Sequence, residues 1–493
     1  MSRTSRRLTR FAAALLVSAG LGGALAGCST NPATGRQSFT GFMSEEDEVQ
    51  IGREQHPQIT AEFGGVYDDP EITRYVDSIG QFLASTSEMP DLKFTFTVLD
   101  SPVVNAFALP GGYVYVTRGL MALANSEAEL AGVIGHEIGH VTARHSAQRY
   151  SQSMLANIGM LGVAIATGSG ALANLAGTGA QLYLQSYSRD QEFEADMLGV
   201  RYLSRATYEP QAMSSFLGSL LADSRLEAAL AGQPGAADEY NIMATHPRTA
   251  DRVQRAIAAA GEKPVDDAMI ERDIYLDKID GMLYGDDPKE GFIKGSRFAH
   301  PVLKFEFTVP QDFRLRNSSA AVIAQGPNGA GIQFDQAPGA PGGDLVDYLA
   351  HDWAGKISLQ NLERITVNGM EGATGTARVN TNAGAADLRL VAIRYDPRTV
   401  YRFLMLTPRN LTDRLSEELR RTTYSFRKLT DAEARALKPQ RIRVVTVGAG
   451  DTVESLARRM AIEDHQVERF RVLNGLTDGE AVRPGQRVKL VAE

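Results

Sequence analysis

Three histidines and a glutamate lie within the stretch HEIGHVTARH, in a chain of 493 residues that has only eight histidines. His136 and His140 are one helical turn apart, so their imidazoles would project from one face and could bind one metal ion. Neutral imidazole is a good zinc ligand, and Glu137 lies where its carboxylate could take a proton from a water molecule. His145 would lie about 140° around the helix from His140 and is expected to point away, as a surface or capping residue.

A catalytic zinc ion needs a third protein ligand, and the stretch SRDQEFEAD offers one. Glu192 and Asp196 are one turn apart and share a helix face. We expect Glu192 to bind the ion. Asp196 is expected to accept a hydrogen bond from the second nitrogen of a ligand histidine and so to select its tautomer. Acidic residues are also common at solvated helix starts, but the histidine pair upstream favours metal binding.

Both stretches are expected to lie on helices that begin at defined residues. Ser126 and Ser188 each stand at capping-box spacing before a glutamate or a glutamine. The first helix also contains Gly135 and Gly139, although a glycine costs about 1 kcal/mol in a helix interior. The two glycines therefore indicate that another element approaches this helix closely.

The residues upstream are expected to form a small sheet with supporting helices. We expect helices at 45–55 and after Pro70, and a strand at 93–99. A hairpin is expected at 106–117, because Pro110-Gly111-Gly112 separates two strand-like runs. Its first arm would offer an edge to an extended peptide substrate, although an ordinary sheet hairpin has the same pattern. The residues of this edge are Asn105, Ala106, Phe107 and Ala108.

Residues 1–27 have the pattern of a lipoprotein signal peptide, with a basic start and an apolar stretch at 11–26 that is short for a membrane span. The sequence LAGC that ends this region resembles a bacterial lipobox, and Cys28 is the single cysteine of the chain. Cys28 is therefore the expected lipidation site, the alternative being an ordinary secretory signal with a chance cysteine. Residues 28–43 are rich in small and polar residues and are expected to be a tether.

The charge balance argues against nucleic acid as a partner. Without the four arginines of residues 1–27, the chain has 47 of its 51 basic residues and all 59 acidic ones, a net charge of −12. A negatively charged surface repels phosphate backbones, and it lacks the broad basic character that would attract it to an anionic membrane surface.

A second apolar stretch, residues 158–175, lies in a span without charged residues. Its glycine content favours a mobile helical hairpin or a lipid-facing flap. A transmembrane helix stays open as the alternative, in which case the chain would be an integral membrane protein.

The expected fold class is multidomain α+β. A mainly helical domain with a small sheet is expected at 44–262, followed by a linker at 263–298 that crosses the surface. At 299–430 the pattern changes to alternating strands with Gly, Pro and Asn turns, which predicts a separate α+β domain. Residues 441–491 have a βααβ pattern.

Several motifs, taken in order, resemble those of zinc metallopeptidases of the HtpX and CAAX-prenyl-protease type, which are gluzincins. These motifs are NPATG, NAFALPGGYVYVTRGL, HEIGHVTARH, SRDQEFEADMLG and ATHPRTADR. The most similar branch is that of the soluble, BepA-like lipoproteins of the bacterial envelope. The resemblance implies that His136, His140 and Glu192 bind one Zn2+ ion per chain. It also implies that Glu137 is the general base and that Asp196 supports a ligand histidine.

His246, in the last of these motifs, is a candidate regulatory zinc ligand. By resemblance it lies in a loop that in related envelope proteases can cap the zinc ion and hold the enzyme inactive. A helix start is an equal alternative, with Thr245 as the cap and Pro247 in the first turn.

The two C-terminal regions show weaker resemblances. Residues 441–491 resemble a LysM module, which implies binding to N-acetylglucosamine-containing glycans and here to peptidoglycan. Residues 299–430 faintly resemble PsbP-like domains, and we expect an interaction module there with an unknown partner.

Together these features predict a zinc-dependent endopeptidase of the bacterial cell envelope that hydrolyses misfolded or misassembled envelope proteins. We expect it in the periplasm, lipid-anchored to the outer membrane, because Ser29 rather than an aspartate follows Cys28. The main alternative is a catalytically silent or capped scaffold or chaperone lipoprotein that binds peptidoglycan.

Overall fold

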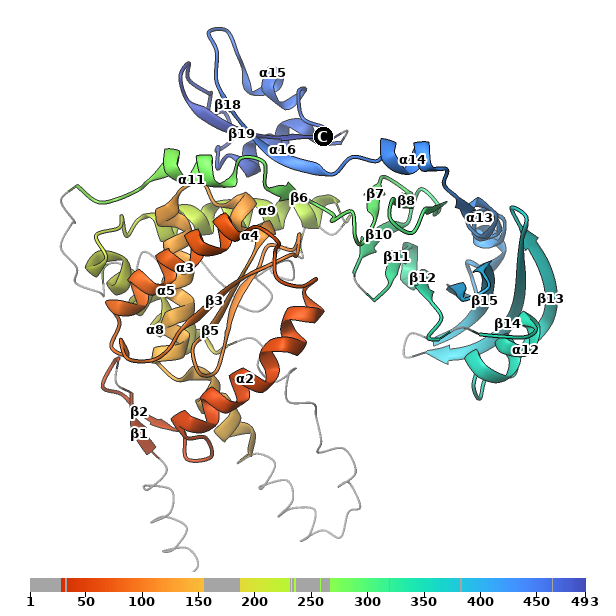
Figure 1. Cartoon of the computed structure of the whole chain (residues 1–493), viewed down its shortest axis with the longest axis horizontal. Coiled ribbons are helices and arrows are strands. Elements are labelled where there is room, and N and C mark those ends of the chain that lie inside the picture. The colour runs from red at the N-terminus through yellow and green to blue at the C-terminus, as the bar shows by residue number, and fades with distance from the viewer. Residues whose placement is uncertain are drawn as a thin grey trace, which may run out of the picture. The chain divides into compact units, whose positions relative to one another are not determined.

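The structure, a computed structural model, describes residues 28–31, 33–154, 187–230, 232, 235, 258, 267–318, 320–339, 341–381, 384–462 and 464–493. They form two compact units: the first combines the residues up to Met282 with Ile442–Ala492, and the second spans Leu283–Arg441 and the last residue (Figure 1). The stretch 158–175 and His246, on which two predictions depend, lie outside the described residues. In the described part of the chain, no helix is both long and apolar enough to cross a membrane.

Helices make up most of the first unit, as expected. Ser44 and Asp69 cap the first two of them, because their side-chain oxygens accept hydrogen bonds from free amides of the first turn. The helices are α2 (Glu45–Glu62), α3 (Pro70–Ser85), α4 (Arg118–Leu123), α5 (Glu127–Thr142), α8 (Arg189–Arg205), α9 (Ala212–Leu230) and α11 (Arg272–Ile279).

The sheet of the first unit contains β3 (Thr95–Leu99), β5 (Tyr113–Thr117) and β4 (Ala106–Leu109), in that order. β5 runs parallel to β3 and antiparallel to β4, so the predicted hairpin is confirmed, and β4 is one of the two edges of this sheet among the described strands. Phe107 and Tyr115 stack on one face of the sheet, in a core cluster that includes residues of α2. On the other face Phe96 packs against Gly80 of α3.

Helices α5 and α8 pack against each other at the two glycines noted above. A side chain at Gly139 would place its first carbon 2.9 Å from the carbonyl oxygen of Ala195, and one at Gly135 would meet the backbone of Gly199. Ser126 and Ser188 cap the two helices as predicted, each accepting a hydrogen bond from a first-turn amide. The expectation of a close approach is therefore confirmed, and α8 is the element that approaches.

The prediction of a tether at 28–43 is wrong for much of its length. β1 (Cys28–Thr30) and β2 (Gln37–Phe39) pair in an antiparallel hairpin, with Cys28 opposite Phe39. We call residues 28–39 the N-terminal hairpin. Asn31 in its turn is buried and donates a hydrogen bond to the carbonyl oxygen of Ala143 at 3.2 Å. Two of the polar side chains that suggested a solvated tether, Asn31 and Thr34, are in fact hydrogen-bonded to the end of α5 and to Glu194 of α8.

The prediction of a linker at 263–298 is also wrong, because much of this range is helix and strand. It contains α11, whose residues Tyr275, Leu276 and Ile279 are buried, and the strands β6 (Leu283–Tyr284), β7 (Phe292–Lys294) and β8 (Arg297–His300). Scattered charged residues hid the short apolar face of this helix, because its few turns give too little periodicity to recognise. The boundary between the compact units falls at Met282, inside the expected linker.

The second unit is an α+β structure. Its larger sheet has the order β10-β11-β12-β16-β15-β14-β13, with every neighbouring pair antiparallel, and its smaller sheet has the order β17-β9-β8-β7. Leu415 and Leu419 of α13 (Thr412–Ser425) join Phe403 of the larger sheet in one core. The remaining elements are β9 (Phe305–Thr308), β10 (Arg314–Asn317), β11 (Val322–Gln325), η4 (Pro327–Gly329), β12 (Gly331–Gln336), α12 (Leu345–Asp347), η5 (Tyr348–Trp353), β13 (Gln360–Val367), β14 (Met370–Thr381), β15 (Gly384–Asp396), β16 (Thr399–Pro408), β17 (Arg427–Lys428) and α14 (Asp431–Ala436).

The C-terminal module has the predicted βααβ order, formed by β18 (Gln440–Thr446), α15 (Val453–Ala457), α16 (Gln466–Leu473) and β19 (Arg487–Ala492). It belongs to the first compact unit. Lys489 of β19 is fully buried, and its Nζ donates to the carbonyl oxygens of Ala122, Leu123 and Ala124 at 2.7, 3.2 and 2.6 Å. The module is therefore held at the C-terminal end of α4, where unpaired helix carbonyls attract a cation.

Candidate metal centre

The second half of α5 and the first turn of α8 bring three potential metal ligands together. Nε2 of His136 lies 3.0 Å from Nε2 of His140, and these nitrogens lie 3.7 and 3.4 Å from the two carboxylate oxygens of Glu192. A tetrahedral zinc ion with ligands at about 2.0–2.1 Å holds its ligand atoms about 3.4 Å apart. The three buried side chains therefore fit one such ion, and the donor set of two imidazoles and a carboxylate suits zinc.

Asp196 lies one turn after Glu192 and is fully buried. Its Oδ1 is 2.9 Å from Nδ1 of His136. A proton on Nδ1 of His136 would face this carboxylate oxygen and would leave the lone pair of Nε2 free for the centre. The structure thus places Asp196 beside the nitrogen of His136 that does not face the other two ligands.

Glu137 follows the first ligand histidine on α5 and is also fully buried. A carboxylate that bulk solvent does not reach can exchange a proton only with groups inside the same buried region. This position is compatible with the expected role of a general base.

The prediction that His145 points away from the site is wrong. His145 is fully buried, and its Nδ1 lies 2.9 Å from Nδ1 of His140. Helix α5 ends at Thr142, and Arg144 has a φ of 55°, in the left-handed region. The helix is therefore interrupted before His145, and an angle counted around a continued helix does not apply.

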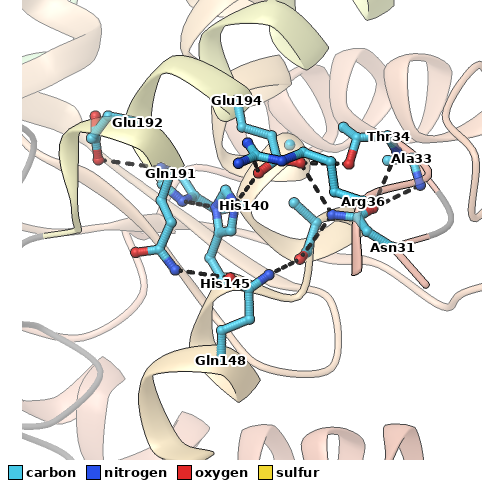
Figure 2. A network of polar contacts seen from close by, with 12 residues as sticks. Asn31, Ala33, Thr34, Arg36, His140, His145, Gln148, Gln191, Glu192 and Glu194 are labelled. Carbon is cyan, nitrogen blue, oxygen red and sulfur yellow. Dashed lines mark hydrogen bonds and ion pairs between the residues drawn. The ribbon is translucent and has the colours of Figure 1, made fainter. Parts of the chain in front are cut away.

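A hydrogen-bonded network surrounds His145 on the side away from the three ligands (Figure 2). Its Nε2 lies 3.4 Å from Oε2 of Glu194. The other carboxylate oxygen of Glu194, Oε1, accepts hydrogen bonds from Asn31 and Thr34 of the N-terminal hairpin. Glu194 is two residues from Glu192, so it points to the other side of α8. The network connects the turn of the N-terminal hairpin to the ligand His140.

Burial and hydrogen bonding set the charge states in this network. Burial lowers the pKa of His145, so the ring is neutral and can accept at one nitrogen. Burial also opposes ionisation of Glu194, but hydrogen bonds from His145 and Thr34 outweigh it and lower the pKa of this carboxyl. The network therefore pairs a neutral imidazole with a carboxylate.

Tyr187 closes another side of the centre. Its ring stacks on the imidazole of His140 with the centroids 3.8 Å apart and the planes at 23°. The guanidinium of Arg149 lies over the ring of Tyr187, 3.8 Å from its centroid. The orientation of His140 is thus constrained by an aromatic ring as well as by hydrogen bonds.

Four residues near the centre were not recognised from the sequence as parts of it: Asn31, Thr34, Tyr187 and Glu194. Two signals were available, because NPATG and the third acidic residue of SRDQEFEAD stand inside motifs that carried the family resemblance. Of the other predicted site residues, 106–108 lie in β4, Asn105 directly precedes it, and Cys28 lies in β1.

Comparison with known proteins shows two regions of similarity. Residues 70–260 match Peptidase family M48, and residues 445–491 match the LysM domain. This part of the chain is therefore similar to the M48 metallopeptidases, and its C-terminal module is similar to LysM domains.

Its curated relatives include bacterial and mitochondrial proteases. The beta-barrel assembly-enhancing protease of Escherichia coli (strain K12) is 31% identical over 245 residues, which cover 48% of this chain and 48% of that protein. The protein of the same name from Yersinia pestis is 34% identical over 192 residues, covering 37% and 39%. The mitochondrial metalloendopeptidase OMA1 of Schizosaccharomyces pombe is 31% identical over 228 residues, covering 45% and 64%. The chain thus spans less than half the length of these two bacterial relatives.

Among solved structures, cyanobacterial PsbP from Synechocystis sp. PCC 6803 aligns with 29% of this chain and 98% of its own chain. The TM-score is 0.23 and the identity 14%, which is too low to assign a fold. The faint PsbP-like resemblance of the second unit stays a prediction.

Proposed function

We propose that this chain is a zinc-dependent endopeptidase of the bacterial cell envelope that hydrolyses misfolded or misassembled envelope proteins. The observation that carries the proposal is the buried cluster of His136, His140 and Glu192, whose ligand atoms have the mutual spacing of a tetrahedral zinc site. The match of residues 70–260 to Peptidase family M48 supports the same reaction class.

The residues of the chain have separate tasks in this reaction. Bound zinc supplies Lewis-acid polarisation of a water molecule and of the peptide carbonyl. Glu137 takes a proton from the attacking water and later delivers it to the leaving amine. Asp196 keeps Nδ1 of His136 protonated, so that its Nε2 stays directed at the centre.

Strand β4 is the proposed docking edge for an extended substrate. The carbonyl oxygen of Asn105 accepts from the amide of Thr117 at 3.0 Å, so the backbone of Asn105 points toward β5. Backbone groups alternate in direction along a strand, and those of Ala106 and Ala108 therefore point away from β5. A peptide added there would be held mainly through its own backbone, which suits unfolded proteins of varied sequence.

The proposed location is the periplasmic side of the outer membrane. Cys28 would carry the lipid anchor and the LysM domain would bind peptidoglycan, as LysM-containing proteins are expected to do. The names of the bacterial relatives refer to assembly of β-barrel proteins, and this supports an envelope substrate.

Cleavage of casein by the wild type and by Glu137→Gln tests the proposal. We expect the wild type to cleave casein and the variant to be slower by about 100-fold to 10,000-fold. Glutamine has nearly the shape of glutamate, but its amide cannot act as a general base. Zinc content of both proteins is measured in parallel, and Glu137→Gln should keep it. Equal cleavage rates would remove Glu137 from the mechanism, and a zinc-loaded wild type without activity would favour the silent scaffold.

A further inference from the structure

The N-terminal hairpin contacts the candidate metal centre through a single carboxylate, that of Glu194 (Figure 2). Oγ1 of Thr34 donates to Oε1 of Glu194 at 2.5 Å, and Nδ2 of Asn31 donates to the same oxygen at 3.4 Å. Arg36 adds an ion pair at 3.6 Å from its Nη1 to Oε2. The turn of the hairpin thus holds one face of this carboxylate.

The other end of the same network is a candidate metal ligand. Glu194 faces His145, and His145 faces His140 through the two Nδ1 atoms, 2.9 Å apart. His145 is fully buried and Glu194 is mostly so. Water therefore does not substitute easily for either partner.

The two groups at the ends of this network, the ring of His140 and the carboxylate of Glu194, determine where each proton lies. A metal at Nε2 of His140 leaves the proton of that ring on Nδ1, which must donate to Nδ1 of His145. His145 then carries its own proton on Nε2 and donates it to Glu194. One consistent set of donors and acceptors therefore runs from the ligand His140 to the carboxylate, and Thr34 and Asn31 complete it.

We propose that the N-terminal hairpin positions the metal ligand His140, with Thr34 and Asn31 as positioning residues that hold Glu194. The inference rests on the proposed zinc site and adds to it a contribution from a segment far away in sequence. Cys28, the proposed lipidation site, lies in β1 of the same hairpin, so the membrane anchor and the metal ligand are structurally connected.

The hairpin has further contacts that do not involve Glu194. Asn31 also donates to the carbonyl oxygen of Ala143, and the carbonyl oxygen of Ala33 accepts from Arg201 at 3.0 Å. Loss of the Thr34 hydroxyl therefore removes one contact to Glu194 and leaves the hairpin attached.

Zinc affinity of the full chain, purified in detergent, tests the proposal by competition with a chelator. We expect Thr34→Val to bind zinc about threefold to tenfold more weakly than wild type, because partners beyond the ligands contribute to metal affinity. Thr34→Ser keeps a hydroxyl and should restore the affinity. Thr30→Val is the matched control, because Thr30 is exposed and its hydroxyl accepts from Gln37 instead.

Melting of the metal-free proteins separates positioning from general stability. We expect Thr34→Val and Thr30→Val to melt together with wild type in the absence of metal. A zinc affinity of Thr34→Val equal to that of wild type would overturn the proposal. So would a weaker affinity if the metal-free variant lost as much stability as it lost free energy of zinc binding. Unchanged zinc binding in His140→Ala would overturn the proposed metal centre itself and this inference with it.

Discussion

Nδ1 of His136 lies 2.9 Å from Oδ1 of Asp196, and both side chains are fully buried. The carboxylate comes from α8 and the imidazole from α5, so the contact exists only where the two helices pack. It directs the other nitrogen of His136 toward Glu192 and His140. The same contact makes Asp196 a target for mutation.

Asp196→Asn should bind zinc about 10-fold to 100-fold more weakly than wild type. The amide has the shape of the carboxylate but no negative charge to support a ligand imidazole, and it can present an N–H in place of an acceptor. Chelator competition measures the affinity. Asp190→Asn is the control on the same helix, because Asp190 is exposed. Equal affinities in both variants would contradict a supporting role for Asp196.

Ala106→Pro should lower the rate constant kcat/KM for casein by about tenfold, which corresponds to one lost hydrogen bond of about 1.4 kcal/mol. The substitution removes an amide that points away from β5, at the first residue of β4, where proline is tolerated. Zinc affinity should change little, whereas the extra atoms of the ring at fully buried Ala106 should lower the melting temperature by a few degrees. Phe107→Pro, whose amide faces β5, should destabilise the protein much more. Full activity of a folded Ala106→Pro would argue against docking at this edge.

Lys489→Met should destabilise the packing of the LysM domain by about 3 kcal/mol, because it leaves three backbone carbonyls at the end of α4 without the buried donor that they share. Denaturant unfolding and the rate of tryptic release of a C-terminal fragment report this loss. Arg483→Met removes an exposed cation from the same domain and should behave as wild type. Identical unfolding of the two variants would show that Lys489 does not hold the domain.

The second unit should lose stability on mild acidification because of His300. Burial lowers the pKa of His300 from 6.5 to about 4, and its Nδ1 accepts a hydrogen bond from the amide of Leu303 at 3.1 Å. At pH 5 the unfolded chain therefore binds a proton that the folded chain does not. The stabilisation is full above about pH 6.5 and is lost as the pH falls toward 4.

Denaturant unfolding at pH 7.5 and pH 5.0 measures this effect. We expect protonation of His300 to account for about 1 kcal/mol of the free energy of unfolding that wild type loses between these pH values, because solvent near the surface screens part of the pKa shift. His300→Asn, which can still accept from the amide, should lose less than wild type. His351→Asn replaces an exposed histidine of the same unit and should lose as much unfolding free energy between the two pH values as wild type does. An equal pH response in all three proteins would exclude His300 as the cause.

Much of the fold was predictable where neighbouring residues decide the structure. The caps at Ser44 and Ser188, the hairpin turn at 110–112 and the βααβ order of the C-terminal module depend on short-range patterns. The errors came where polar side chains find partners far away. The composition around Asn31 predicts a tether, yet the side-chain amide of Asn31 reaches Glu194, 163 residues further along the chain.

Four-residue spacing places His136 with His140, and Glu192 with Asp196, on common helix faces whatever surrounds them, so the candidate metal ligands are recognisable from the order of residues. That the two faces meet is a property of the folded chain. Backbone contact between Gly139 and Ala195 sets the separation of α5 and α8, and the left-handed turn at Arg144 brings His145 back to the ligands. Such distances depend on packing between segments that are remote in the chain, and local spacing carries no information about them.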